Sequence, residues 1–307
     1  MRTAFLQGLD DLASKDDRIM FITADLGFGV FEEFEEKYPS QYLNAGVAEQ
    51  NMTAIAAGMA LEGRKVFTYS IGNFPTLRCL EQIRNDLCYH DLNVKIIGMG
   101  GGFSYGQLGM SHHATEDISI MRSLPNMTVI APGTAEDVSG AMKAFSEIEN
   151  PAYLRLDKSK ADDQPQAEPF ILGKARYICE GDALTIVASG GILGDVLVAK
   201  NELSKQGIHC CVLSMHTIKP IDGDALLDAS INTGGILTVE ENNILGGLGG
   251  AVAEFCLENN IRPKVFKRMG LQDAYPSVVG DQNYLKTYYQ IDSESIENTV
   301  IELLRSS

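Results

Sequence analysis

The sequence lacks several features that would place it in common functional classes. It has no tryptophan, and its 25 lysines and arginines are outnumbered by 41 acidic residues, giving a formal net charge of −16. Nucleic acids and anionic membranes are bound through basic patches, so this balance argues against both partners. The apolar runs fall short of the roughly 20 residues that span a bilayer, and residues 1–17 contain no apolar signal-peptide core. We therefore expect a cytoplasmic protein.

The six cysteines and the glycine-rich segments lack the spacings of well-known motifs. No two cysteines form a CxxC pair, which favours free buried thiols in a reducing compartment. Residues 98–109, GMGGGFSYGQLG, have neither the lysine of a P-loop nor the third glycine of a dinucleotide fingerprint. No GxSxG segment marks a hydrolase nucleophile. The glycines at 98–109 therefore indicate a flexible loop or a close approach of the backbone to a ligand.

The chain contains two regions in which apolar segments of strand and helix type alternate. For 307 residues, two domains of about 150 residues each are expected. We place them at 1–158 and 173–307, joined by the polar, proline-containing linker 159–172. This alternation predicts α/β domains: first a doubly wound parallel sheet covered on both faces, then a smaller α/β unit.

Apolar periodicity and turn residues locate the individual elements. Strands are expected at 18–26, 65–70, 94–101, 127–132, 151–156, 183–190, 209–215, 234–242 and 263–270. Helices are expected at 2–15, 48–62, 76–90, 115–124, 134–148, 193–207, 222–230 and 249–259, with two polar helices at the end of the chain. Because ligands bind parallel sheets at the carboxyl ends of the strands, the candidate site lies in the loops after Leu26, Ser70 and Gly98.

Residues 42–53, YLNAGVAEQNMT, place Glu49 among small and apolar residues at the start of an apolar helix. An acid in the first turn is favoured by the helix dipole, and in that role it would stay in water. Alternatively, Glu49 is a buried acid held for proton chemistry. Its sequence neighbours are too small to pair with its charge, so the residues themselves leave both interpretations open.

The segment GMSHHATED places His112 and His113 at the end of the glycine-rich loop. Adjacent residues point apart on a regular element, and the usual spacings of zinc ligands are missing, so no metal site is expected here. One interpretation is a loop histidine satisfied by hydrogen bonds. The other assigns His112 to general acid–base chemistry, which suits its place beyond the end of a strand.

Several longer segments resemble one enzyme family. NAGVAEQNMTAIAAGMALEG, LEQIRND and GMSHHATEDISIMRSLPNMTVIAPG are similar to the pyrimidine-binding domain of transketolases, and HTIKPID, LTVEEN and GGLGG to the transketolase C-terminal domain. The resemblance covers essentially the whole chain and implies a thiamine-diphosphate-dependent transketolase, which transfers a two-carbon ketol unit from a ketose to an aldose. The β subunit of a 2-oxoacid decarboxylating dehydrogenase and an enzyme similar to deoxyxylulose phosphate synthase remain alternatives.

The resemblance implies roles for individual residues in catalysis and cofactor binding. Glu49 matches the acid that hydrogen-bonds N1′ of the thiamine aminopyrimidine and so promotes loss of the thiazolium C2 proton. His112 matches the histidine that handles the donor sugar's hydroxyl group and its proton. Phe74, with Tyr69 as the alternative, matches the aromatic residue that stacks on the pyrimidine. Asp25 matches an acidic position near the cofactor and the subunit interface.

The sugar-binding residues match the family pattern less closely. Arg2 and Lys158, with Arg155 as an alternative to Lys158, fall near positions that hold the sugar phosphate, and His113 joins His112 in the predicted substrate-binding set. The aspartate that reads the stereochemistry of the donor's hydroxyl groups is replaced by Leu108. The resemblance therefore implies intact ketol-transfer chemistry with an altered sugar-recognition set, and a sugar substrate that carries an anionic group.

One part of a complete transketolase is missing from the sequence. Family members hold the diphosphate through Mg²⁺ with a GDG motif followed by asparagine, and no GDG occurs in this chain. The resemblance therefore implies the C-terminal subunit of a split transketolase. An N-terminal subunit with the GDG…N motif would hold Mg²⁺ and the diphosphate, and an α2β2 heterotetramer is expected.

Overall fold

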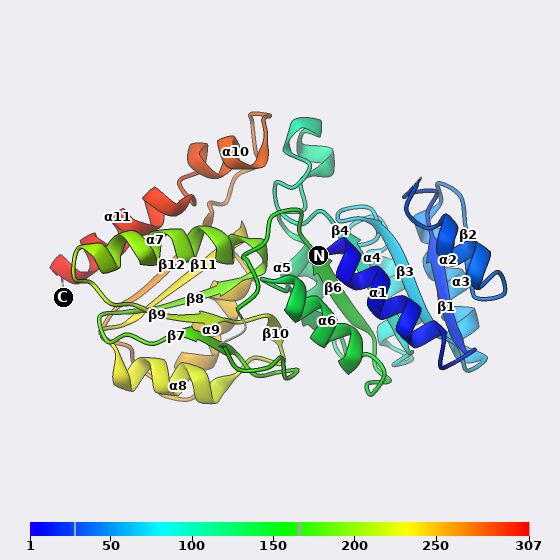
Figure 1. Cartoon of the computed structure of the whole chain (residues 1–307), viewed down its shortest axis with the longest axis horizontal. Helices are drawn as coiled ribbons and strands as arrows, with labels where there is room; N and C mark the ends of the chain where they lie inside the picture. The colour runs from blue at the N-terminus through cyan, green and yellow to red at the C-terminus, as the bar shows by residue number, and fades with distance from the viewer. Residues whose placement is uncertain (28, 165–166, 307) are drawn as a thin grey trace.

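Buried strands that alternate with helices build two sheets, which lie next to each other along the long axis of the molecule (Figure 1). The computed structural model describes residues 1–27, 29–164 and 167–306. The predicted linker 159–172 includes residues 165–166, which lie outside the described residues. The two largely parallel sheets confirm the predicted α/β fold class.

The first sheet has seven strands in the order β10-β5-β6-β4-β3-β1-β2. β10 runs antiparallel to β5, while the other strand pairs are parallel. The strands are β1 (Ile19–Thr23), β2 (Tyr42–Asn44), β3 (Lys65–Ile71), β4 (Val94–Met99), β5 (Thr128–Ile130), β6 (Ala152–Leu156) and β10 (Thr217–Lys219). The carboxyl ends of the parallel strands meet along one edge of the sheet, where ligands bind in folds of this kind.

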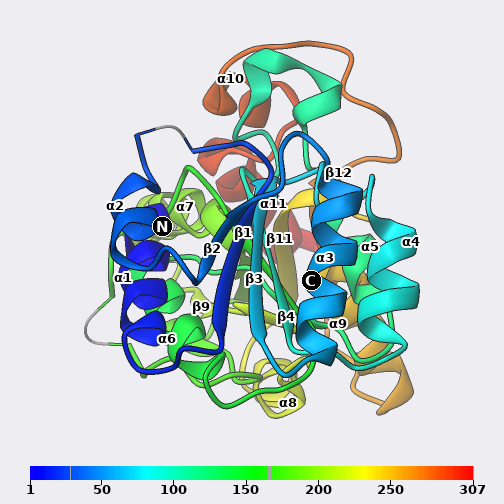
Figure 2. The same cartoon turned by 90° about the vertical axis from the view of Figure 1, so that its right-hand side faces the viewer.

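Helices cover both faces of this sheet (Figure 2). One side carries α1 (Arg2–Ala13) and α6 (Ala135–Ala144), and the other α3 (Glu49–Leu61), α4 (Leu80–Gln82) with the π-helical Ile83–Cys88, and α5 (Asp117–Ser123). α2 (Glu32–Lys37) precedes the edge strand β2. Ile19 and Phe21 of β1 belong to one core cluster, and Met20 and Ile22 belong to the other. This apolar character on both sides is what a parallel sheet between two helical layers requires.

The second sheet has five strands in the order β12-β11-β8-β9-β7, with β7 antiparallel to β9. The strands are β7 (Arg176–Cys179), β8 (Thr185–Ser189), β9 (Cys211–Ser214), β11 (Ile236–Asn243) and β12 (Phe266–Leu271). The helices are α7 (Leu193–Lys205), α8 (Gly223–Asn232), α9 (Leu248–Glu258), α10 (Gln282–Tyr288) and α11 (Ser293–Ser306). α7 and α11 contribute to one core cluster, whereas α8 and α9 contribute to the cluster shared with the first sheet.

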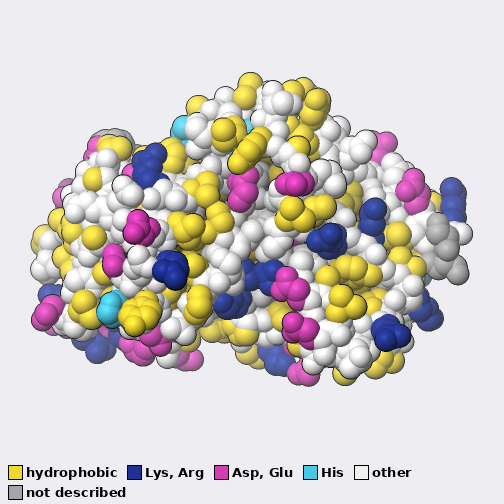
Figure 3. All heavy atoms as spheres, turned by 180° about the vertical axis from the view of Figure 1, so that it is seen from behind, with side chains coloured by type: hydrophobic (Ala, Val, Ile, Leu, Met, Phe, Trp, Pro, Cys, Tyr) yellow, Lys and Arg dark blue, Asp and Glu magenta, His cyan; other side chains and the backbone are white. Residues whose placement is uncertain are grey.

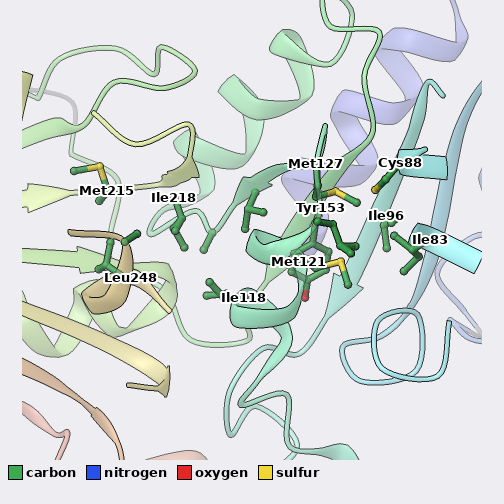
Figure 4. Close-up of a cluster of buried hydrophobic side chains, with 14 of the residues drawn as sticks. Ile83, Cys88, Ile96, Ile118, Met121, Met127, Tyr153, Met215, Ile218 and Leu248 are labelled. Atoms are coloured by element: carbon green, nitrogen blue, oxygen red, sulfur yellow. The ribbon is translucent and has the colours of Figure 1, made fainter. Parts of the chain in front are cut away.

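The two halves of the chain are joined by apolar packing as well as by β10. Met215, Ile218 and Leu248 from the second half lie in one buried cluster with Ile118 and Met121 of α5 (Figure 4). β10 extends the first sheet although it belongs to the predicted second domain, 173–307. The two halves therefore share core and sheet, which fixes the loops of one against the other.

A buried arginine adds a polar connection between the halves. Arg176 of β7 is 1% exposed, and its guanidinium donates to Asp137 Oδ1 at 2.5 Å and to Glu136 Oε2 at 2.8 Å. Asp137 is fully buried in the first turn of α6, where it forms a capping box with Thr134. The carboxylate thus satisfies backbone N–H groups of the helix and one cation from the other sheet.

The observed elements differ from the expected ones mainly where segments are short. The helix expected over 76–90 is a turn followed by α4 and the π-helical Ile83–Cys88. Three short strands, β2, β7 and β10, and the acidic helix α2 were not predicted. β2 and β10 have three residues each, too few to show a period, and β7 pairs antiparallel at a sheet edge. In α2, Phe34 is the buried residue, so the sequence carries no apolar stripe.

Replacement of Arg176 by methionine should destabilise the fold by about 3–5 kcal/mol, because Asp137 would remain buried without its cation. Thermal and urea unfolding measure this change. Lys205→Met is the matched control, since Lys205 pairs with Glu202 in a site where both side chains are largely exposed. The control should change the unfolding free energy by less than about 1 kcal/mol. Equal stabilities of the two variants would contradict a structural role for the buried pair.

Candidate active site

Glu49 lies at the first position of α3, close to the carboxyl end of β3. Its side chain is only 2% exposed. Oε2 accepts a hydrogen bond from Nη1 of Arg78 at 2.7 Å, and Oε1 accepts a longer one from Oγ of Ser70 at 3.3 Å. The carboxylate is thus at a helix N-terminus but out of water, with one strong and one weak partner. The pairing partner is not a neighbour in the sequence but comes from 29 residues farther along the chain.

A continuous row of cationic and aromatic side chains leads away from Glu49. The Arg78 guanidinium carbon lies 4.6 Å from the centre of the Phe74 ring. Next to Phe74, the His112 ring packs edge-on with its centre 5.1 Å away. Tyr105 follows at 6.5 Å from His112, and the Lys158 ammonium lies over the Tyr105 ring at 3.7 Å. The structure thus brings Glu49, Phe74, His112 and Lys158 together in one row.

Glycine geometry explains the course of the loop that carries His112. Gly100 has a φ of 87°, and a Cβ at this position would lie 2.1 Å from the Tyr105 ring. A side chain is therefore excluded on both conformational and steric grounds. The loop backbone packs under Tyr105 and presents that ring beside His112, so the glycines make room for a site residue and bind no nucleotide phosphate in the usual pattern.

The same loop is anchored to the second half of the molecule by Glu241. The backbone N–H of Phe103 donates to Glu241 Oε1 at 2.5 Å, and the side-chain amide of Gln282 donates to both carboxylate oxygens at 3.0 Å. Glu240, its neighbour in VEEN, accepts from the N–H groups of Leu248 and Gly249 at the start of α9. Glu240 therefore caps the first turn of α9, and Glu241 anchors the loop.

The segment around the loop stands out from the body next to α10 (Figures 1 and 2). It contains two short 3-10 turns, Gly106–Leu108 and Met110–His112. Leu108 and Met110 are more than half exposed, as is Val279 of the adjacent loop. This projection therefore has an apolar surface (Figure 3).

Two predicted substrate-binding residues are placed elsewhere. His113 is 1% exposed, and its Nε2 bonds to the carbonyl of Gly106 at 3.0 Å while its ring packs on Phe103. Arg155 is 2% exposed and is paired with Asp117 and Asp157. The structure thus argues against direct substrate contact by either residue, because one is a buried histidine bonded through Nε2 to its own loop and the other a buried cation between carboxylates.

Tyr69 is also separated from the row of side chains. Tyr69 packs in the aromatic core with Phe5 and Phe31, and burial raises the pKa of its hydroxyl. It belongs to the opposite core cluster from the one beneath α3, so the structure does not bring it to Glu49. Asp25 lies after β1 with a φ of 55° and bonds to the side-chain amide of Asn44 at 2.9 Å.

Arg2 completes the cationic end of the site. Both Arg2 and Lys158 are exposed. Partial burial over Tyr105 lowers the pKa of Lys158, and the nearby Arg2 charge lowers it further. Two cations this close repel each other, so an anion between them would be favoured. Tyr105 and Arg78 were not predicted from the sequence. The glycine run before Tyr105 could have indicated that residue, whereas no sequence feature indicated Arg78.

Comparison with known proteins places this site in a family. The family model for "Transketolase, pyrimidine binding domain" matches residues 1–163, and that for "Transketolase, C-terminal domain" matches 173–296. The chain belongs to the transketolase family. The resemblance seen in the sequence is thereby confirmed, and the two matches follow each other in the expected order.

Its relatives include subunits of split transketolases. The chain is 35% identical to an apulose-4-phosphate transketolase subunit of Phocaeicola vulgatus, over 99% of this chain and 97% of that protein. It is 35% identical to a 6-deoxy-6-sulfo-D-fructose transketolase subunit of a Clostridium species, over 99% and 94%. A solved split-gene transketolase, described as an inactive β4 tetramer, matches with a TM-score of 0.89 and 33% identity, over 99% and 98%.

Transketolase-family enzymes depend on thiamine diphosphate, and the side chains at this site fit one end of that cofactor. A buried carboxyl group can bond to a nitrogen of the aminopyrimidine, and the half-exposed Phe74 ring can stack against it.

Over the described ranges, no group of three or more histidine, cysteine or acidic side chains is placed to hold a metal ion. Within the same ranges, no helix is long and apolar enough to cross a membrane.

The anchor of the loop should make stability depend on pH. Burial, and next the charge of Asp157, raises the pKa of Glu241 from 4.5 to about 7. The folded protein then binds more protons than the unfolded chain between about pH 4.5 and 7, so the free energy of unfolding falls as the pH rises through this window. Glu241→Gln mimics the protonated acid. The decrease in the free energy of unfolding across this pH window should therefore be smaller by about 3 kcal/mol in the variant.

Urea unfolding at pH 5 and pH 8 measures this effect. Glu258→Gln is the control, because Glu258 is an exposed acid at the end of α9. Its stability should change with pH as that of the unmodified protein does. An unchanged pH dependence in Glu241→Gln would show that Glu241 is ionised in the folded state at all these pH values.

Proposed function

We propose that this chain is the catalytic half of a split transketolase, which transfers a two-carbon ketol unit from a ketose to an aldose. The observation that supports this most is the buried carboxyl of Glu49 at the start of α3, in a row with Phe74 and His112. When bound, thiamine diphosphate supplies the nucleophilic carbon for ketol transfer. The residues of this chain hold that cofactor's pyrimidine end and move protons on the sugar.

Each residue has a defined task in this proposal. Glu49 bonds to N1′ of the aminopyrimidine, and its burial strengthens the bond because water cannot compete for it. Phe74 stacks on the pyrimidine ring. His112 is half-buried with its Nδ1 3.0 Å from the Ser111 hydroxyl, which leaves Nε2 to exchange a proton with the donor's hydroxyl group. Asp25 contributes to the cofactor region at the subunit interface.

A second subunit completes the site. We infer that it carries the GDG…N motif, holds Mg²⁺ and the diphosphate, and forms an α2β2 heterotetramer with this chain. Two relatives of nearly the same length are named as subunits, and the β4 assembly of the solved split-gene relative is described as inactive. The free cysteines of the chain suit a reducing cytoplasm.

The substrate in this proposal is an anionic ketose. Arg2 and Lys158 are exposed at one end of the row although the chain carries a net charge of −16. The relatives' names refer to sugars with a phosphate or a sulfo group. Leu108 stands where the family has an aspartate, and it is 57% exposed on the projection beside His112. This apolar position favours a donor that lacks the usual hydroxyl stereochemistry there.

Glu49→Gln should lower ketol transfer by about 10²–10⁴-fold, because the amide cannot share a proton with the pyrimidine. The assay mixes the variant with its diphosphate-binding subunit, a ketose donor and an aldose acceptor. A parallel assay replaces the ketose by pyruvate, and the two donors are compared. Glu62→Gln, at the exposed end of the same helix, should keep full activity. Full activity of Glu49→Gln would overturn the proposal, and turnover by this chain alone would overturn the split site.

Lys158→Gln should raise KM for an anionic ketose about tenfold with a smaller change in kcat, because a charge-assisted hydrogen bond to the anion is lost. For an uncharged ketose, KM should stay the same. Lys15→Gln is the control for net charge. Lys15 is exposed and lies just beyond the C-terminal end of α1, whereas Arg2 lies at the N-terminal end. An equal effect on charged and uncharged donors would contradict anion binding by Lys158.

A further inference from the structure

Arg78 contacts the same two groups that the proposed function assigns to the cofactor's pyrimidine. Its Nη1 donates to Oε2 of Glu49 at 2.7 Å, and the guanidinium carbon lies 4.6 Å from the centre of the Phe74 ring. A guanidinium is planar, with hydrogen-bond donors at its edge and a face that stacks on aromatic rings. Arg78 thus makes an edge contact with the carboxyl and a face contact with the aromatic ring, the two contacts proposed for the aminopyrimidine.

We propose that Arg78 is a positioning residue that guards Glu49 and must leave it before the cofactor can bind. This inference rests on the proposed function. One guanidinium contacts both the Phe74 ring and the Glu49 carboxyl, so it fills space that a ring stacked on Phe74 and bonded to Glu49 would need. One planar group occupies that place at a time, so Arg78 and the pyrimidine compete for it.

The surroundings of Arg78 allow such an exchange. Its side chain is 46% exposed, whereas Glu49 is 2% exposed, so the cation can move into water while the carboxyl stays in place. Arg78 belongs to the turn over residues 73–79, before α4 begins at Leu80. Within the part of the chain that the structure describes, its guanidinium has no second carboxylate partner. Release therefore breaks one ion pair and the stacking on Phe74, but no secondary structure.

The guard has a physical purpose in this arrangement. A carboxylate at 2% exposure is costly unless a cation or hydrogen bonds compensate its charge. The Ser70 hydroxyl at 3.3 Å is a weak partner, so Arg78 carries most of that compensation. Arg78 orients the Glu49 carboxyl group, and the pyrimidine takes over as its partner when the cofactor arrives.

The test is calorimetric titration of thiamine diphosphate with Mg²⁺ into the complex of this chain with its diphosphate-binding subunit. Arg78→Gln should lower the Kd about tenfold, since the cofactor no longer displaces a charge-assisted hydrogen bond. Arg78→Lys retains the charge and should restore most of the competition. Arg84→Gln is the matched control. Arg84 is also an exposed arginine, it follows the turn in the chain, and its guanidinium donates to the side chain of Asn85.

A double variant separates competition from a general change in structure. In a Glu49→Gln background, Arg78→Gln should lower the Kd much less than in the unmodified background, because the ion pair is gone and only the stacking on Phe74 still competes. Equal or weaker cofactor binding by Arg78→Gln alone would overturn the guard while leaving the proposed function intact. Failure of the unmodified complex to bind thiamine diphosphate would overturn both.

Discussion

The site depends on a single constraint: a carboxyl group removed from water needs hydrogen-bond and charge partners among nearby groups. Glu49 meets this constraint with partners from two elements, Ser70 of β3 and Arg78 of the turn before α4. The first turn of α3 adds a favourable dipole. One oxygen of Glu49 has a strong partner and the other a weak one. These partners stabilise the buried carboxyl group but still allow it to exchange one partner for another.

A second charged cluster determines where the glycine-rich loop before His112 lies. Arg155 sits between Asp117 and Asp157 and donates to the carbonyl of Glu241 at 2.7 Å. Glu241 in turn holds the backbone of Phe103, three residues after Gly100. The glycine loop is therefore fixed by contacts from both sheets, and these contacts also fix the position of His112 at its end. A role in folding rather than in substrate binding accounts for the complete burial of Arg155.

The sequence was informative where a property is local and poor where it depends on distant residues. The long strands β3, β4 and β11 have apolar runs bounded by turns, so their positions were predictable. Glu49 was conspicuous because a lone acid stood in an apolar segment. Its partner Arg78 was not, because no sequence rule links residues 29 apart through a sheet edge. His112 and His113 are neighbours with the same side chain, and only the fold shows that one faces Phe74 and the other Phe103.

Burial also sorts the cations of this acidic chain into two classes. Arg155 and Arg176 are 2% and 1% exposed; Arg155 is paired with carboxylates of the first half, and Arg176 with a carboxylate across the two halves. Arg2, Arg78 and Lys158 have exposed side chains and lie along the row that begins at Glu49. A buried, paired arginine has no free donors for a substrate, whereas an exposed one beside an aromatic ring can exchange its partner at little cost. The cations able to exchange partners at this site are therefore the exposed ones, and they lie beside aromatic rings in a chain whose net charge is −16.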